Sequence, residues 1–275
     1  IPVPENPRDR KLFDIPGHEE TLFAIASDPE APRSMVTVYF KFSAEEDNTV
    51  GDYRKGILEN IYSGMFNNRL NELAQDEDPP FIFGYSGKGR FVRTSQVYML
   101  AAMVRDNGIE RGLDALLTEA ERVKKYGFTE TELQRQKQAV LRSMEKAYAE
   151  RNKIESQSLA AEYIRNFLFN EPVPGIEYEY MLYQKLVPGI TLEEINQLAK
   201  ELVRSESRVV AVESPEKESI TVPTEADLKK VFAAVGEKEI VPYSDDVLDI
   251  PLLASVPDPK PVVSETIHEE LGVTE

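Results

Sequence analysis

The chain has 275 residues, of which 41% are hydrophobic, and a formal net charge of −17 at pH 7. This length suits one large domain with appendages or two small domains, and 12 Phe with 12 Tyr are ample for a hydrophobic core. The negative charge argues against nucleic acid as a partner, because the phosphates would be repelled. No run approaches the roughly 18 apolar residues of a membrane span, and the absence of Cys excludes disulfides and thiolate metal ligands.

Proline divides the chain into three regions. Six of the 18 Pro lie in the first 32 residues and seven in the last 61, which leaves five for the whole middle. We expect residues 1–20 to be a linker from a preceding domain, residues 21–213 to form the folded body, and residues 214–275 to be an acidic, Pro-rich connector to a following half. Within that connector only Thr224–Val235 shows helical spacing.

The first half of the body mixes strand and helix patterns. β-Branched and aromatic residues in short runs indicate strands, and apolar residues repeating every three or four positions indicate a helix with one buried face. The predicted elements are strands at 21–27 and 34–42, a helix at 51–75, and strands at 81–85 and 90–104. Pro79-Pro80 ends the helix, and the glycine-rich residues 86–89 are expected to form a hairpin turn between the last two strands.

The second half of the body is mostly helical. The expected elements are helices at 109–126, from 129 towards 151, at 163–168, at 178–186 and from 191, followed by a strand at 208–214. Gly127 closes the first of these helices, and two capping-box patterns, Thr129-x-x-Glu132 and Thr191-x-x-Glu194, open two others. The order of elements predicts an α+β fold, in which an antiparallel-rich mixed sheet carries helices on one face.

Catalytic motifs are missing from the sequence. A zinc peptidase needs two His one helical turn apart and a carboxylate base. The two His of this chain, His18 and His268, are 250 positions apart, and we interpret both as solvent-exposed side chains. No G-x-S-x-G pattern and no Cys supports a covalent nucleophile, and no pair among the 49 acidic residues stands out. We therefore expect neither catalytic nor metal-binding residues here.

The block from Ile57 to Val104 resembles a known family. Its helix ILENIYSGMFNNRLNELAQ, the segment PPFIFGYSGKGR and the strand FVRTSQVYMLAAMV are similar to the stretch that pitrilysin/insulinase-type (M16) zinc metallopeptidases repeat in their non-catalytic domains. The later segments GFTETELQRQK and ITLEEINQLA fit the same domain. The resemblance implies the LuxS/MPP-like metallohydrolase fold, and it matches the second, non-catalytic domain of a large bacterial zinc protease.

The same resemblance bears on catalysis. In the family's last domain an Arg, and a Tyr seven residues later, help to stabilise the tetrahedral intermediate. The matching positions here are Ala74, which has no donor, and Phe81, which lacks the hydroxyl. The resemblance therefore implies an inactive copy, with the zinc of the parent protein bound by a different domain.

The resemblance also implies a substrate-binding site. In relatives the second domain anchors peptides far from the zinc, through a helix and the adjoining strand edge. The matching residues here are Gly64, Met65, Phe66, Asn67, Gly84, Tyr85 and Ser86. Several have alternatives: Gly64 permits close packing of the helix, and Met65 with Phe66 also fits a buried face.

Two functions from different classes follow. The first is a fragment of an M16-type zinc metalloendopeptidase that forms part of a peptide-enclosing chamber and contributes a substrate exosite. The alternative is a non-catalytic peptide-binding or scaffold subunit that partners an active M16 protease, and an unrelated ferredoxin-like binding module is a third hypothesis. An inverted zinc motif in a preceding domain would favour the first. Expected partners are other domains of the same chain and unfolded peptides, in the bacterial periplasm or cell envelope rather than the cytoplasm.

Overall fold

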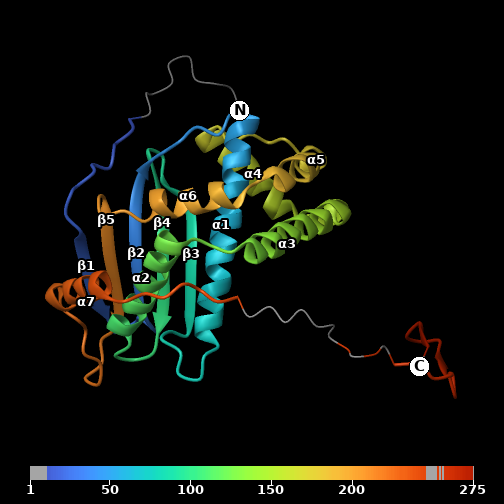
Figure 1. Ribbon diagram of the computed structural model, residues 1–275. Helices are drawn as coiled ribbons and strands as arrows, with labels where there is room; N and C mark the ends of the chain where they lie inside the picture. Colours follow the sequence, from blue (N-terminus) through green and yellow to red (C-terminus); the bar gives the residue numbers. More distant parts are fainter. Residues whose placement is uncertain (1–10, 246–252, 254, 256, 275) are drawn as a thin grey trace, which may run out of the picture. The chain divides into compact units, whose positions relative to one another are not determined.

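A five-stranded sheet forms one layer of the fold (Figure 1). The computed structural model describes residues 11–245, 253, 255 and 257–274. The strands are β1 (Leu22–Asp28), β2 (Ser34–Ser43), β3 (Phe83–Val92), β4 (Ser95–Val104) and β5 (Arg208–Pro215), in the spatial order β1-β5-β2-β4-β3. β1 runs parallel to β5, and the other neighbours are antiparallel. The sheet is therefore mixed and mostly antiparallel, as predicted.

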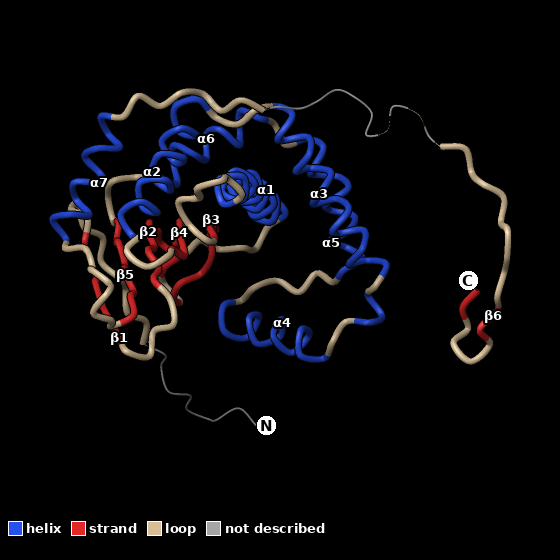
Figure 2. The backbone as a smooth tube through the Cα atoms, turned by 90° about the horizontal axis from the view of Figure 1, so that it is seen from below, coloured by secondary structure: helices blue, strands red, loops and turns tan. Residues whose placement is uncertain are grey.

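Helices cover one face of this sheet (Figure 2). The helices of this layer are α1 (Val50–Ala74) and α2 (Ile109–Tyr126), with α6 (Leu192–Leu202) and α7 (Glu225–Glu237) packed against them. α3 (Glu130–Ala149), α4 (Ser156–Phe169) and α5 (Ile176–Leu186) extend away from the sheet, and 3₁₀ turns lie at Arg151–Lys153 and Val187–Gly189 (Figure 2). Alternate strand residues such as Val38, Leu100 and Val210 are fully buried beneath α1 and α2. The hydrophobic core thus lies between the sheet and these helices, and the predicted α+β fold is confirmed.

Local sequence signals set the helix ends. The Thr129 side chain accepts the N–H of Glu132 while the Glu132 carboxylate accepts the N–H of Thr129, and Thr191 and Glu194 do the same for α6. Both capping boxes were predicted, and the same device begins α1 and α7. α2 ends at Tyr126, and the next residue, Gly127, has a φ of 75° that suits a residue without a side chain. These helix ends could be predicted from sequence, because each depends only on residues next to it in the chain.

Glu194 also joins α6 to α1. Its carboxylate accepts hydrogen bonds of 2.7 and 3.0 Å from the two terminal nitrogens of Arg54. The Arg54 guanidinium, aided by the Thr191 N–H, holds the pKa of Glu194 down to about 2. The unfolded chain titrates this group near about 4.3, so the stabilisation is complete above about pH 5 and is lost as pH falls towards 2.

A pH series tests this link. We expect Glu194→Gln to lower the free energy of unfolding by about 0.5–1 kcal/mol at pH 6, since both side chains are partly exposed to solvent. The difference from the native chain should shrink as pH falls and vanish below the Glu194 pKa, because the native carboxylate is then protonated. Urea unfolding at five pH values measures it. A pH-independent difference would show that packing, not charge, was lost.

The predicted hairpin turn at residues 86–89 is wrong. β3 continues through these residues, and the turn lies at Arg93-Thr94. Gly87 is in extended pairing with Met99, and a Cβ at this position would collide with the hydroxyl of Tyr85. The glycine therefore makes room for the Tyr85 ring beside the strand, rather than reversing the chain.

The compact unit ends later than the predicted body. It runs to Ser244, because α7 packs on α2 with Leu228 and Val235 buried, and the Tyr126 hydroxyl donates to the carbonyl of Ile240 at 2.8 Å. Residues 214–244, assigned from sequence to a connector, thus complete the helical layer. The second unit begins at Asp245, and among its described residues the short strands Ile267–His268 and Val273–Thr274 pair antiparallel.

The residues before β1 lie against the ends of the central strands. The carbonyls of Phe13 and Pro16 accept hydrogen bonds from Thr94 Oγ1 and Lys41 Nζ. His18 was expected to be solvent-exposed, yet its side chain is partly buried here, and its Nε2 is covered. This correction reflects the packing of the leading segment, of which residues 1–10 lie outside the described residues. His268 is exposed.

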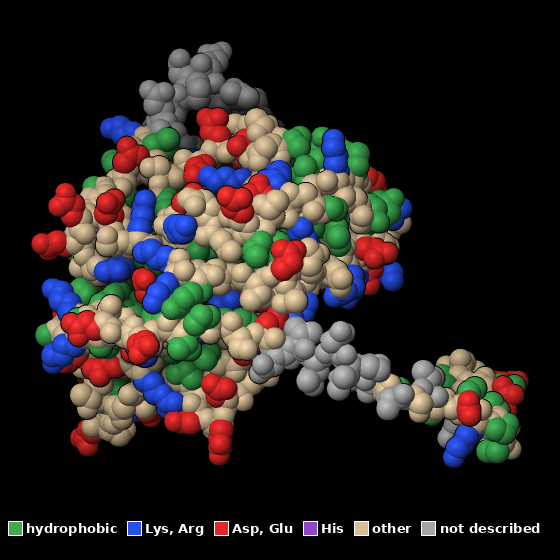
Figure 3. Space-filling view, viewed as in Figure 1, with side chains coloured by type: hydrophobic (Ala, Val, Ile, Leu, Met, Phe, Trp, Pro, Cys, Tyr) green, Lys and Arg blue, Asp and Glu red, His purple; other side chains and the backbone are tan. Residues whose placement is uncertain are grey.

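α4 buries none of its side chains. Tyr163, Phe167 and, on α5, Met181 expose 49–72% of their surface. Hydrophobic side chains gather over this region in Figure 3, at the upper right. An exposed apolar area of this kind is unusual on an isolated domain and is typical of a surface that contacts another body.

Candidate functional site

The seven predicted substrate-binding residues lie on two packed elements. Gly64, Met65, Phe66 and Asn67 are on α1, and Gly84, Tyr85 and Ser86 are on β3, the strand at one edge of the sheet. α1 lies alongside β3, and one side chain joins the two directly. The Ser86 N–H donates to Asn67 Oδ1 at 2.6 Å, and Asn67 Nδ2 donates to the Ser86 carbonyl at 3.0 Å.

Three of the α1 residues serve the packing of the helix. Met65 and Phe66 are 1% and 0% exposed, and the Phe66 ring stacks on Tyr62 with centroids 6.2 Å apart. A Cβ at Gly64 would collide with the Gln136 side chain of α3. The side chains at these positions therefore face the core and a neighbouring helix, and Asn67 is the one directed at the strand edge.

β3 presents different residues to its two faces. Gly84 and Ser86 are buried on the side of α1, and a Cβ at Gly84 would lie 2.9 Å from the Phe81 ring. Phe83 and Tyr85 point to the opposite face and are 51% and 42% exposed. The strand thus combines an edge that no other described strand pairs with and exposed aromatic side chains on the face opposite α1.

Buried hydroxyls near this edge are core groups. Tyr62 and Tyr98 are fully buried with ring centroids 6.0 Å apart. Burial raises the pKa of both phenols far above the usual value. Each phenol therefore stays protonated at physiological pH.

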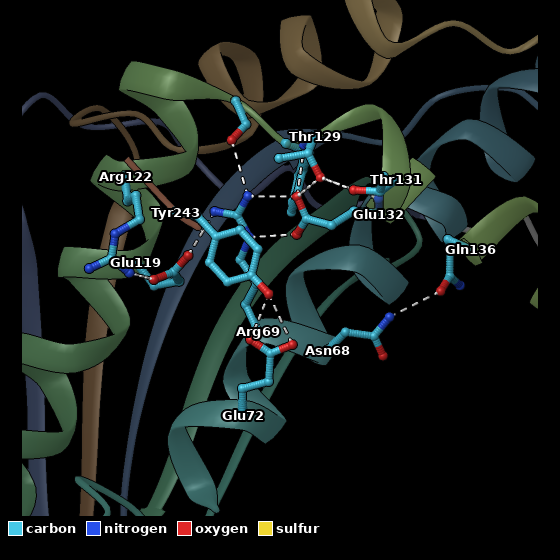
Figure 4. A network of polar contacts seen from close by, with 12 residues as sticks. Asn68, Arg69, Glu72, Glu119, Arg122, Thr129, Thr131, Glu132, Gln136 and Tyr243 are labelled. Carbon is cyan, nitrogen blue, oxygen red and sulfur yellow. Dashed lines mark hydrogen bonds and ion pairs between the residues drawn. The ribbon is translucent and has the colours of Figure 1, made fainter. Parts of the chain in front are cut away.

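A buried ion network lies beside the site and was not predicted (Figure 4). Arg69 of α1 is 2% exposed, and its guanidinium donates to both oxygens of Glu132 at 2.7 and 2.9 Å and to Glu119 Oε1 at 3.0 Å. Arg122 pairs with the other oxygen of Glu119. Burial disfavours the charged guanidinium, but Glu132 and Glu119 more than offset it and raise the pKa of Arg69.

The end of the compact unit closes over this network. The Tyr243 ring covers the Arg69 guanidinium with 4.0 Å from Cζ to the ring centroid, and the Tyr243 hydroxyl donates to Glu72 at 2.8 Å (Figure 4). A carbonyl of the same segment, that of Val241, accepts from Arg122 Nε at 3.1 Å. This network therefore joins four parts of the chain at one point: α1, α2, α3 and the segment after α7.

The sequence did contain a signal for this network. Arg69 follows Phe66 by three positions, and Glu119 follows Leu116 by three, so each charged residue falls on an apolar helix face. Charged groups on buried faces need partners. The pairing itself could not be predicted, because the partners are 50 and 63 positions apart.

The described residues do not form a metal centre. Among them there is no group of three or more His, Asp or Glu side chains arranged to hold a metal ion. Phe81, at one of the two positions matched to catalytic residues of the family, is 2% exposed and packs beneath Gly84. The residues that the structure describes thus do not fit a zinc site of the peptidase type.

Comparison with known proteins identifies the class of this fold. No protein-family model matches the chain. A solved structure described as a peptidase M16 inactive domain, from Pseudomonas fluorescens, superposes with a TM-score of 0.56 at 13% identity, over 80% of this chain and 49% of that one. The fold is thus that of the M16 peptidases, and the resemblance found in the sequence is confirmed.

Two zinc proteases are similar to the chain over nearly its whole length. A zinc protease PQQL-like protein of Arabidopsis thaliana is 29% identical over 264 residues, which is 96% of this chain and 25% of that protein. The probable zinc protease PqqL of Escherichia coli is 22% identical over 96% of this chain and 29% of its own length. The crystal structure of this periplasmic protease superposes with a TM-score of 0.80 at 16% identity. The chain spans about a quarter of the length of the relatives it matches.

Proposed function

We propose that this chain is a non-catalytic domain of a larger M16-type zinc metalloendopeptidase, where it forms part of the wall around the peptide substrate. Its similarity to two zinc proteases over a quarter of their length supports this, as does its fold likeness to an M16 inactive domain. The exposed hydrophobic residues of α4 and α5 fit a domain that packs against other regions of a longer chain.

The zinc ion of such a protease would be bound by a different domain. The residues described here offer no group of three ligands, and the two His lie on separate units. The chemistry of peptide hydrolysis, polarisation of a carbonyl and activation of water, would therefore be supplied elsewhere in the parent protein. None of the described helices is both long and apolar enough to cross a membrane. Because the E. coli relative is periplasmic, we propose the periplasm or cell envelope as the location.

The role of this domain would be to hold an extended peptide at the outer edge of β3. One observation carries this assignment: β3 is an edge strand with no described strand paired to its outer side, and it displays the exposed aromatic residues Phe83 and Tyr85. Main-chain pairing with an edge strand is insensitive to peptide sequence, and aromatic side chains add apolar contact. Such a site suits a promiscuous protease.

Amide chemical shifts test this docking. Titration of the isotope-labelled chain with an unfolded peptide should shift the amides of residues 83–88 and leave those of β1 unchanged. β1 is the matched control, because it is the opposite edge of the same sheet and exposes the aliphatic Leu22 and Ile25 rather than aromatic side chains. Equal shifts on both edges, or none on β3, would contradict the assignment.

Metal analysis tests the inactive role. The purified chain is expected to contain no stoichiometric zinc and to leave unfolded peptides uncleaved over hours, because the described residues lack a ligand group and an oxyanion donor pair at Ala74 and Phe81. Elemental analysis after dialysis against zinc measures the first, and peptide mass spectrometry the second. One zinc per chain retained at the end of dialysis would overturn the assignment.

A further inference from the structure

Asn67 occupies the middle of the proposed docking edge. Its carboxamide offers one acceptor and one donor to a single residue, at 2.6 Å to the Ser86 N–H and 3.0 Å to the Ser86 carbonyl. This is the pair of hydrogen bonds that a residue of a neighbouring antiparallel strand would make. The side chain of Asn67, which comes from α1, thus lies where a sixth strand would pair with β3.

The pairing of β3 with β4 shows which backbone groups this involves. In an antiparallel pair, alternate residues direct both their N–H and C=O away from the partner strand. Ser86 uses both groups towards Asn67, so it is directed outward, and Gly84 and Lys88 share its orientation. An added strand would pair with these three residues. The backbone groups of the central one, Ser86, are already hydrogen-bonded to Asn67.

An edge strand with a blocked position is less open to other chains. Exposed edges pair with whatever extended chain is available, and proteins reduce this hazard by covering or interrupting the edge. Asn67 is partly buried and held by the well-packed stretch of α1 between Phe66 and Leu70, so it covers Ser86 in the free protein. Lys88 is also engaged on the α1 side, where its Nζ contacts Glu59 at 2.6 Å.

We infer that Asn67 sets the affinity of the β3 edge for extended peptide, because an incoming main chain must displace its carboxamide from Ser86 to pair along the strand. The inference rests on the proposed docking function and names the residue that controls it. The partner is the backbone of an unfolded peptide, and the energetic cost of binding includes two hydrogen bonds already made within the protein.

Removal of the carboxamide should therefore strengthen binding. Asn67→Ala is expected to lower the dissociation constant for an unfolded peptide about threefold to tenfold, since one to two internal hydrogen bonds no longer compete. Before peptide is added, the Ser86 amide should exchange its hydrogen faster in the variant than in the native chain. Asn67→Asp keeps the size and the acceptor but loses the donor, so a smaller gain is expected.

Asn68→Ala is the matched control. Asn68 is the next residue on α1, exposed, and its Nδ2 contacts Gln136 of α3 at 3.4 Å rather than β3. Its substitution should leave both the affinity and the Ser86 exchange rate unchanged. All four proteins are titrated with the same labelled peptide, with amide shifts at residues 83–88 as the readout of location.

The outcomes separate the inference from the function on which it rests. If peptide shifts β3 in the native chain and binds Asn67→Ala no more tightly, the docking site stands and the role of Asn67 is refuted. Weaker binding to Asn67→Ala would also refute it, since the carboxamide would then contact the peptide. Absence of β3 shifts in every protein would refute the docking function itself.

Discussion

Arg69→Ala is expected to lower the free energy of unfolding by about 3–5 kcal/mol. The substitution removes the partner of two carboxylates, Glu132 and Glu119, in a region where the native guanidinium is 2% exposed. Breaking one side of a buried ion network leaves uncompensated charge out of contact with water. It also removes the cation beneath the Tyr243 ring, so the segment after α7 should loosen.

Arg111→Ala provides the comparison for Arg69. Arg111 pairs with Asp78 at 2.8 Å, but the two side chains are 52% and 79% exposed, so the expected loss is about 0–1 kcal/mol. Urea unfolding followed by circular dichroism measures both variants at pH 7. Similar small losses for the two would show that the Arg69 network is offset by its own desolvation in the native state.

Phe66→Ala is expected to cost about 3–5 kcal/mol of unfolding free energy. Phe66 was a candidate substrate-binding residue, and the structure places its ring in the core with no exposed surface, stacked on Tyr62. The loss is the sum of two free energies: the transfer free energy of the removed apolar side chain and the cost of the cavity that it leaves. Chemical denaturation of the variant measures the loss, and peptide binding measured below the transition should be retained.

Phe83→Ala is the matched substitution on the docking strand. Phe83 is the same residue type at 51% exposure, so its loss should change stability by no more than about 1 kcal/mol. If β3 holds peptide, this variant should weaken binding while Phe66→Ala does not. The reverse pattern, with binding lost in the Phe66→Ala protein under conditions where it is folded, would return Phe66 to the substrate site.

Much of the helical layer was predictable because its signals are local. The helix at 109–126 was found to the residue, since its apolar spacing ends at a glycine that adopts positive φ. The capping boxes of Thr129 and Thr191 depend on side chains three positions apart, within the reach of a single turn. Such features form from neighbours in sequence and do not depend on distant contacts.

The β3 region shows where prediction from local patterns fails. Gly87 and Gly89 indicated a turn, because glycine is common in reversals of the chain. In the structure both pair with β4, and the space that Gly87 leaves is taken by the Tyr85 side chain. The need for glycine came from a neighbouring ring and a strand partner, neither of which spacing alone specifies.

The candidate site divides in the same way. The helix ending near Ala74 and a strand containing Gly84 and Tyr85 were placed from sequence, whereas Ser86 was expected in a turn. The family resemblance supplied the missing donor pair at Ala74 and Phe81. The contact between Asn67 and Ser86 was not predicted, because it joins side chain to backbone across two elements.

Short-range chemistry thus accounts for the fold class, the helix ends and the lack of a metal motif, since each depends on residues within a few positions of one another. Folding alone brought Arg69 to Glu119 and Glu132, extended the compact unit to Ser244 and set Asn67 against the edge of β3. Those contacts depend on the packing of whole elements, and the burial that makes them strong arises only when the layers assemble.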